Sequence, residues 1–214
     1  MKICEIFTSI QGESTLQGCP TVFLRLSGCN LNCRYCDTVY AREGGRIMTP
    51  ASVVATVTHT GLRYACITGG EPLLQEETPE LARELLRLGL IVSIETNGTI
   101  DASNLPMGVR RIIDIKCPGS GEHGKTHPRL IAERRPTDEY KFVISDRDDF
   151  DYACRFVSAH DLSAEHTVLF APVFGILAPR MLSRWILTEM ADVRLNLQLH
   201  KYIWPEGPEG SKEM

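Results

Sequence analysis

The sequence contains three closely spaced cysteines, Cys29, Cys33 and Cys36, in a C-x3-C-x2-C pattern. Iron–sulfur clusters are usually held by four thiolates, one for each iron of a cubane cluster. Three thiolates on one short loop therefore predict a 4Fe–4S cluster with one iron left for another ligand. The alternative is structural zinc, which takes four protein ligands, and no second Cys or Cys/His pair has the spacing to complete that set.

A second motif that could bind a ligand lies at residues 68–72, TGGEP. Its two glycines let a backbone edge approach a ligand closely, and Glu71 adds an acceptor for an ammonium group. On its own, the motif is equally well explained as a turn that ends a strand.

Two further polar motifs end later strand-like runs. In residues 93–98, SIETNG, the side chains of Ser93 and Glu95 share one face of a strand because successive side chains alternate. In residues 114–121, DIKCPGSG, Lys116 can meet a carboxylate or ribose hydroxyls, whereas the glycine-rich part can equally be a simple loop.

These motifs must be positioned by strands that alternate with helices, a pattern that predicts parallel strands joined by helical crossovers. Strands are expected over residues 21–26, 64–68, 91–95, 111–115, 140–144, 167–170 and 194–199. Helices are expected over residues 50–58, 76–88, 148–160 and 179–190, the first with Thr49 as its N-cap and Pro50 in its first turn.

The predicted fold class is α/β. The strands read as apolar throughout, which is typical of a parallel sheet covered on both faces. A closed eight-fold barrel takes roughly 250 residues, so 214 residues fit a partial barrel of the (β/α)6 type with six parallel core strands. A short strand over residues 4–10 forms an N-terminal extension. Chemistry in such folds gathers at the C-terminal ends of the strands, where we expect all the motifs.

Composition excludes several classes of protein. Hydrophobic residues make up 43% and charged residues 23%, as in ordinary globular enzymes, and the net charge of -4 argues against a basic nucleic-acid-binding surface. No apolar run is long enough to span a bilayer, and the N-terminus lacks the pattern of a signal peptide. A cytoplasmic, reducing location is therefore expected, in which the eight cysteines are metal ligands and buried thiols rather than disulfides.

The cysteine loop together with the Gly-Gly-Glu-Pro motif resembles the radical S-adenosylmethionine (SAM) superfamily. The resemblance implies that the cluster's open iron binds the amino and carboxylate groups of SAM. One-electron cleavage of SAM would then give methionine and a 5′-deoxyadenosyl radical. Tyr35 matches the aromatic position beside the last cysteine, where backbone groups face the adenine.

Motifs near the two ends of the chain indicate a resemblance to one family within this superfamily. Residues 7–14 (FTSIQGES) and 197–204 (LQLHKYIW), with Arg25 and residues 36–38 (CDT), resemble 7-carboxy-7-deazaguanine synthases over nearly the whole chain. That family is a group of lyases that convert 6-carboxy-5,6,7,8-tetrahydropterin to 7-carboxy-7-deazaguanine with loss of ammonia, on the route to queuosine and related deazapurines. The resemblance implies hydrogen abstraction from C6 of the pterin, ring contraction and re-formation of SAM.

The resemblance also assigns candidate site residues. Those expected at the pterin substrate are Ile10, Gln11, Gly12, Glu13, Arg25, Thr68 and His200. Those expected at SAM are Tyr35, Cys36, Asp37, Gly70, Glu71, Ser93, Glu95, Asp114, Ile115 and Lys116. Cys29, Cys33 and Cys36 would hold the 4Fe–4S cluster, and Thr38 would contact Mg2+. No residue is assigned as a nucleophile or base.

The chemistry of these residue types suits a pterin. Gln11 and Glu13, with backbone groups beside them, can pair with its amide–amidine edge. Arg25 offers the planar fork that a carboxylate prefers, although a strand arginine in an ion pair is the equally ordinary explanation. His200 can donate or accept a proton near neutral pH.

The family resemblance further implies a homodimer and an electron donor such as a flavodoxin or ferredoxin. Residues 1–214 are expected to form one domain, with residues 205–214 as a polar tail that either folds back as a lid or stays flexible. Two alternatives remain: a glycyl-radical-enzyme activase, which would share the cysteine loop and the Gly-Gly-Glu-Pro turn, and a non-catalytic metal-binding module.

Overall fold

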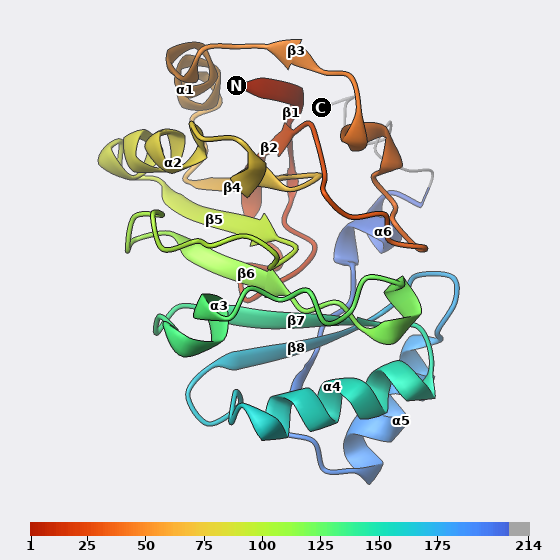
Figure 1. The fold of residues 1–214 in the computed structure, drawn as a ribbon. Coiled ribbons are helices and arrows are strands. Elements are labelled where there is room, and N and C mark those ends of the chain that lie inside the picture. Colours follow the sequence, from red (N-terminus) through yellow and green to blue (C-terminus); the bar gives the residue numbers. More distant parts are fainter. Residues whose placement is uncertain (206–214) are drawn as a thin grey trace.

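The computed structural model describes residues 1–205, and its strands form one nine-stranded sheet in the order β3-β1-β2-β4-β5-β6-β7-β8-β9. Strands β2 and β4 to β9 pair in parallel, whereas β1 pairs antiparallel with both β2 and β3 (Figure 1). The strands are β1 Lys2–Ile10, β2 Pro20–Leu26, β3 Arg46–Ile47, β4 Tyr64–Gly69, β5 Ile91–Thr96, β6 Arg110–Asp114, β7 Glu139–Ile144, β8 Thr167–Pro172 and β9 Arg194–Leu195. The six predicted core strands are thus confirmed as β2 and β4 to β8.

The helices connect the parallel strands. They are α1 Pro50–His59, α2 Thr78–Arg87, α3 Arg129–Ala132, α4 Arg147–Ala159, α5 Pro179–Thr188 and α6 Leu199–Ile203, with short 3-10 turns η1 Val39–Arg42, η2 Pro72–Leu74 and η3 Pro118–Ser120. Helix α1 begins as predicted, because the Thr49 side chain accepts a hydrogen bond from the Ser52 N–H and Pro50 lies in the first turn. Residues 1–205 contain no helix with the length and apolar character needed to cross a bilayer.

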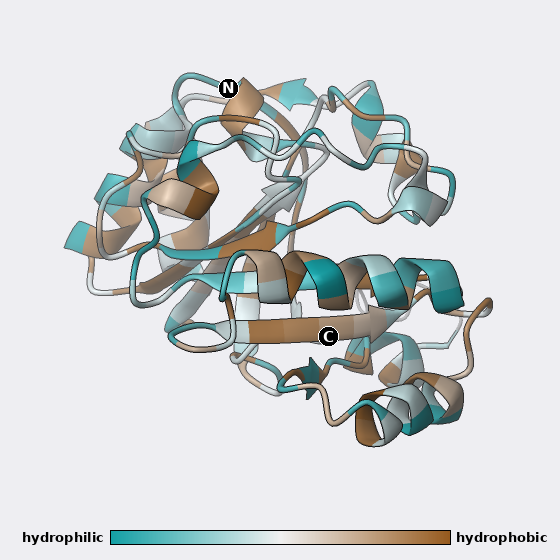
Figure 2. Ribbon diagram, turned by 60° about the horizontal axis from the view of Figure 1, so that its bottom comes forward, coloured by the Kyte–Doolittle hydropathy of each residue, from teal (hydrophilic) through white to brown (hydrophobic). Residues whose placement is uncertain are grey.

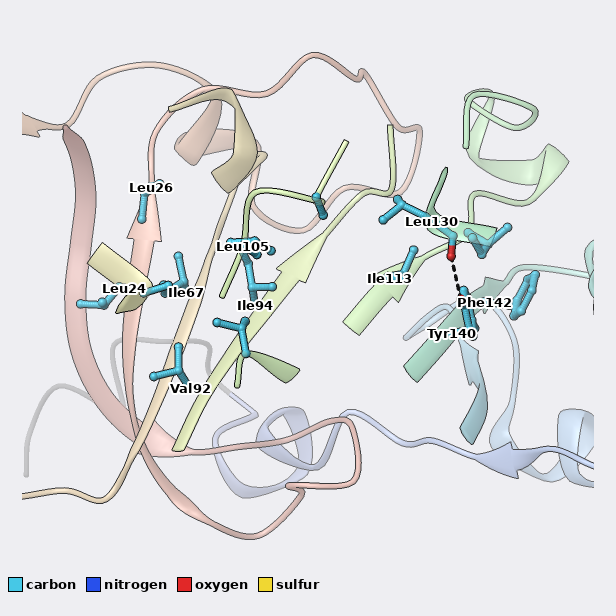
Figure 3. Close-up of a cluster of buried hydrophobic side chains, with 14 of the residues drawn as sticks. Leu24, Leu26, Ile67, Val92, Ile94, Leu105, Ile113, Leu130, Tyr140 and Phe142 are labelled. Carbon is cyan, nitrogen blue, oxygen red and sulfur yellow. Dashed lines mark hydrogen bonds between the residues drawn. The ribbon is translucent and has the colours of Figure 1, made fainter. Parts of the chain in front are cut away.

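The two faces of the sheet differ in chemistry. The hydrophobic core lies on the helix-covered face, where Leu24, Ile67, Ile94, Ile113 and Phe142 are buried (Figure 3). Figure 2 shows hydrophobic colours along the central strands and mixed colours on the helices, as expected for helices with one buried side. Apolar burial of this kind contributes about 25 cal/mol for each Å² removed from water.

The alternate residues of the same strands carry polar side chains on the other face. Arg25, Thr68 and Glu95 lie there on β2, β4 and β5, and hydrogen bonding links Thr68 to Glu95. The prediction that the strands are apolar throughout was therefore wrong. The inner face of the sheet carries polar side chains among apolar ones, and this face carries the candidate site.

The open sheet is bridged by the segment that follows β1. The Gly12 carbonyl accepts a hydrogen bond from the Leu199 N–H at 2.9 Å, and the Ser14 N–H donates to Asn196 Oδ1 at 3.1 Å. The first and last parts of the described chain therefore meet, and Figure 1 shows α6 beside the N-terminal strands.

The last predicted strand, over residues 194–199, is largely wrong. β9 ends at Leu195, and residues 199–203 form helix α6. The physical reason is that these residues bond to the segment after β1 rather than extending the ladder on β8: the N–H of Leu199 donates to the Gly12 carbonyl. Of the tail expected over residues 205–214, residues 206–214 lie outside the described part of the chain.

Candidate active site

The cysteine loop leaves the end of β2 and is held at several points. The Gly28 N–H donates to the Ala41 carbonyl at 2.9 Å, which closes the loop on itself. The Arg34 N–H donates to the Ser120 carbonyl at 3.0 Å, which ties the loop to the turn after β6. Hydrogen bonds within the chain thus fix the loop at its start and in its middle.

The three candidate cluster thiols are all partly exposed and free of disulfides. The pKa of Cys33 is raised, first by burial, while Lys116 opposes that rise and the neighbouring thiols Cys36 and Cys29 add to it. Cys29 Sγ lies 3.9 Å from Asn97 Nδ2, and Cys36 Sγ lies 3.7 Å from Thr38 Oγ1. The structure thus brings the three thiols within electrostatic reach of one another.

The turn after β4 packs directly against this loop. The Glu71 N–H donates to the Gly28 carbonyl at 2.7 Å. A Cβ atom on Gly70 would lie 2.0 Å from the Gly28 carbonyl oxygen and 2.9 Å from Cys29 Cβ. Glycine at position 70 is therefore required for the close approach, as the motif predicts.

Glu71 itself is fully buried, and its carboxylate is occupied by this chain's own donors. It accepts hydrogen bonds from the Leu73 N–H at 2.9 Å, the Asn97 N–H at 2.6 Å and the Thr96 hydroxyl. The expectation that Glu71 also accepts from an ammonium group of SAM stays a prediction. Its role in the structure is to hold the turns after β4 and β5 together.

The strand ends of β5 and β6 supply the other groups expected at SAM. Asp114 Oδ2 pairs with Lys116 Nζ at 3.0 Å, whereas Asp114 Oδ1 is buried with no hydrogen-bond partner in residues 1–205. Ser93 is buried in the first half of β5, with its hydroxyl 3.5 Å from the Ala65 carbonyl. Ile115 is a core residue, so only its backbone can face a ligand.

Two residues of the cysteine loop are anchored by distant parts of the chain. The Tyr35 hydroxyl donates to the Val143 carbonyl at 3.1 Å, and burial raises the pKa of this phenol. Asp37 pairs with Lys201 of α6 at 2.6 Å, so its carboxylate serves an ion pair that joins the loop to α6. Loop and C-terminal helix are thereby linked.

Gln11 and Glu13 face the inner side of the sheet from the segment after β1. Gln11 Nε2 donates to Glu95 Oε1 at 3.4 Å, and Glu95 Oε2 accepts from Thr68 at 3.0 Å. Because β1 runs antiparallel to β2, the end of β1 at Ile10 lies opposite Pro20, where β2 starts. The expectation that every motif lies at C-terminal strand ends was therefore wrong for residues 10–13, which approach from the other end.

Arg25 lies on the inner face with 14% of its side chain exposed. Its Nε donates to Glu5 Oε1 at 2.7 Å, and its guanidinium lies over the rings of Phe7 and Tyr40. Glu5 and Glu95 help to keep its pKa raised against the effect of burial. Arg25 thus does form the ordinary ion pair, with Glu5, and it uses the Nε atom of its guanidinium to do so.

His200 is brought to the site by α6 rather than by a strand. A Cβ atom on Gly12 would lie 2.0 Å from His200 Nδ1, so the ring packs against the backbone of the Gln11–Glu13 segment. Burial lowers the pKa of His200, and nearby Glu13 only partly offsets this. Burial therefore favours the neutral imidazole.

The donor set fits the groups that the motifs imply. Three thiols on one loop, the glycine turn packed against that loop, and the unpartnered Asp114 Oδ1 match a cluster and a ligand with hydroxyl donors. In residues 1–205, no three His, Cys, Asp or Glu side chains are grouped around the position of a single metal ion.

Several residues of the site were missed from the sequence. Lys141, on β7, pairs with Glu13 at 2.8 Å, and Gln198 Nε2 donates to the same carboxylate at 2.8 Å. Asn97 donates to Asn30 Oδ1 at 2.9 Å and so orders the start of the cysteine loop. Asn97 and Gln198 lie within motifs that the sequence singles out, and the available signal for Lys141 was a charged residue next to the apolar run of its strand.

Comparison with known proteins agrees with this geometry. Residues 24–115 match the Radical SAM superfamily. The chain is 46% identical to a 7-carboxy-7-deazaguanine synthase of Methanospirillum hungatei over 95% of this chain and 85% of that protein. It is 41% identical to the enzyme of the same name from Koribacter versatilis, over 98% of this chain and 100% of that protein.

Solved structures show the same fold. The crystal structure of QueE from Escherichia coli superposes with a TM-score of 0.78 at 21% identity, covering 93% of this chain and 94% of that one. With relatives of this identity spanning nearly its full length, the chain belongs to the 7-carboxy-7-deazaguanine synthase family of radical SAM enzymes.

Proposed function

We propose that this chain converts 6-carboxy-5,6,7,8-tetrahydropterin to 7-carboxy-7-deazaguanine with release of ammonia, in the biosynthesis of queuosine or related 7-deazapurines. One observation carries the proposal: the Gln11–Glu13 segment, Arg25 and Glu95 share a polar inner face beneath a loop with three free thiols. Curated relatives of the same name support it.

Cys29, Cys33 and Cys36 would hold a 4Fe–4S cluster, and SAM would lie between the cysteine loop and the ends of β4 to β6. When bound, the two groups together supply a carbon-centred radical that removes a hydrogen atom. The chain's own contribution is to position donor and acceptor and to exclude water from them. Asp114 Oδ1, buried and unpartnered in the described chain, is the acceptor we assign to a ribose hydroxyl.

Groups on the inner face of the sheet that complement a pterin would bind the substrate. Glu13 and Gln11 offer acceptor and donor atoms to the amide–amidine edge, and the Arg25 guanidinium is the counter-charge for the carboxylate. Thr68 lies beside Glu95, and His200 packs on Gly12. No side chain of the set needs to act as a nucleophile.

Further expectations join the proposal. Thr38 would contact a Mg2+ ion whose remaining ligands are water and substrate oxygens, since Mg2+ accepts few protein ligands. A flavodoxin or ferredoxin would supply electrons, the enzyme would be a cytoplasmic homodimer, and residues 1–214 would form one radical SAM domain.

An anaerobic assay tests the function. The chain is reconstituted with iron and sulfide, reduced, and incubated with SAM, Mg2+ and 6-carboxytetrahydropterin, and the deazaguanine acid is sought by mass spectrometry. Product formation is the expected result. Cleavage of SAM without that product would overturn the substrate assignment and favour the activase alternative, and zinc without SAM cleavage would favour a metal-binding module.

A further inference from the structure

A buried lysine that the proposed mechanism does not use lies at the centre of the inner face. Lys141 is the third residue of β7 and is 8% exposed. Its Nζ lies 2.8 Å from Glu13 Oε2 and 3.7 Å from Asp114 Oδ2. A buried charge is costly unless it is paired, so this lysine is placed by its carboxylate partners.

The two oxygens of Glu13 are each held by one donor. Gln198 Nε2 donates to Oε1 at 2.8 Å, and Lys141 Nζ donates to Oε2 at 2.8 Å. The backbone is fixed as well, because the Glu13 N–H donates to Gln11 Oε1 at 3.1 Å. Each carboxylate oxygen can accept two hydrogen bonds, so each keeps one acceptor direction after these contacts.

The charges around the pair favour the ionised carboxylate. Burial raises the pKa of Glu13, but Lys141, Gln198 and His200 outweigh that effect and lower it to about 2. Lys141 is in turn kept protonated by Glu13, Asp114 and Glu95, against the effect of burial. Lys116, beside Asp114, is the other cation near this group.

We propose that Lys141 and Gln198 are positioning residues that fix the Glu13 carboxylate as a paired acceptor for the amidine edge of the substrate. The inference rests on the proposed function and deepens it by naming how the two N–H donors of that edge are recognised. A carboxylate held at both oxygens is pre-organised for two donors, whereas a protonated Glu13 would present an O–H to an N–H.

The test compares three variants with the full-length wild type. In Lys141→Met, we expect KM for the pterin to rise about 10-fold, equal to the loss of one charge-assisted hydrogen bond. KM should rise further as the pH is lowered, because burial raises the pKa of Glu13 once the opposing charge of Lys141 is gone. Iron content and the Kd for SAM should change by less than about twofold.

The other two variants separate charge from geometry. Gln198→Leu should raise KM without the pH dependence, since Lys141 still holds Glu13 ionised. Lys141→Arg should recover part of the wild-type KM, because it keeps the charge. Lys2→Met, at an exposed position, serves as the matched control and should behave as wild type.

The inference is overturned if Lys141→Met binds and turns over the pterin with a wild-type KM that does not depend on pH. If that variant fails to fold, Gln198→Leu decides: an unchanged KM overturns the inference, and a raised KM supports it. Wild-type protein that neither binds nor converts the pterin is a distinct result, which removes the proposed function and this inference with it.

Discussion

The Glu71 carboxylate accepts a hydrogen bond from the Asn97 N–H at 2.6 Å, although the two residues follow different strands. The same carboxylate caps the first turn of η2 through the Leu73 N–H. Because Asn97 in turn donates to Asn30, the buried glutamate is connected to the start of the cysteine loop. Glu71, which the motif predicts to lie at SAM, therefore also supports the cysteine loop in this structure.

The first prediction follows from this contact. In Glu71→Gln, the amide group must place an N–H against one of the N–H or O–H donors that now point at the carboxylate. We expect the free energy of unfolding to fall by about 1–3 kcal/mol and iron retention to fall with it. Chemical denaturation and iron analysis measure both. Glu84→Gln, on the outer side of α2, is the control and should leave both unchanged.

A methyl group at position 70 should displace the cysteine loop. In Gly70→Ala, the new Cβ would meet the Gly28 carbonyl oxygen at 2.0 Å, and backbone cannot move aside cheaply. We expect iron per chain to fall severalfold and stability to drop by about 1–3 kcal/mol. Gly108→Ala meets only the flexible Leu86 side chain and should retain its iron. Full iron loading of Gly70→Ala would show that the loop is less constrained than its contacts indicate.

Asp149 should affect the affinity for SAM, although it is not one of the residues expected to contact SAM. Its buried carboxylate accepts from the Gly119 N–H at 2.7 Å and from the Ser145 hydroxyl at 2.6 Å, joining the turns after β6 and β7. Asp149→Asn should raise the Kd for SAM about 10-fold through loss of one such bond. The neighbouring, exposed Asp148→Asn is the matched control. Equilibrium binding decides, and equal Kd values for the two variants would contradict the prediction.

Arg25 should act on the substrate and not on the cluster. Arg25→Lys retains the charge but loses the planar fork that contacts Glu5 and can meet a carboxylate. We expect kcat/KM for the pterin to fall about 10- to 100-fold, as for loss of a charge-assisted pair worth 1.5–3 kcal/mol. The visible spectrum of the cluster should not change. Loss of that spectrum would mean that the residue supports the loop instead.

The Glu13–Lys141 pair predicts how stability depends on pH. Because the folded-state pKa of Glu13 is lowered to about 2 from an ordinary 4.5, its contribution to stability is fully present above pH 4.5. That contribution is lost as the pH falls through 4.5 toward 2. The double variant Glu13→Gln/Lys141→Met removes both charges, so its stability should fall less steeply over this range. Denaturation curves between pH 5 and pH 2.5 test this, and equal slopes would contradict it.

Much of the fold could be predicted from local pattern. The strands β2 and β4 to β8 and the start of α1 at Thr49 follow from apolar runs and from capping residues, which are local in sequence. The polar inner face of the sheet could not be predicted from these local patterns. The role of a lysine at position 141 of a strand cannot be inferred until the fold places a partner such as Glu13, 128 positions earlier, opposite it.

The sequence by itself determined the chemistry that is possible here, because three thiols on one loop and a glycine turn are encoded within short stretches of chain. Only the tertiary structure decided which polar groups remain available to a ligand. It buried Glu71 among backbone donors, turned residues 199–203 into a helix, and brought that helix to Gly12. The physical reason is that hydrogen bonds between distant segments satisfy buried polar groups, and such pairings have no signature in any one stretch of sequence.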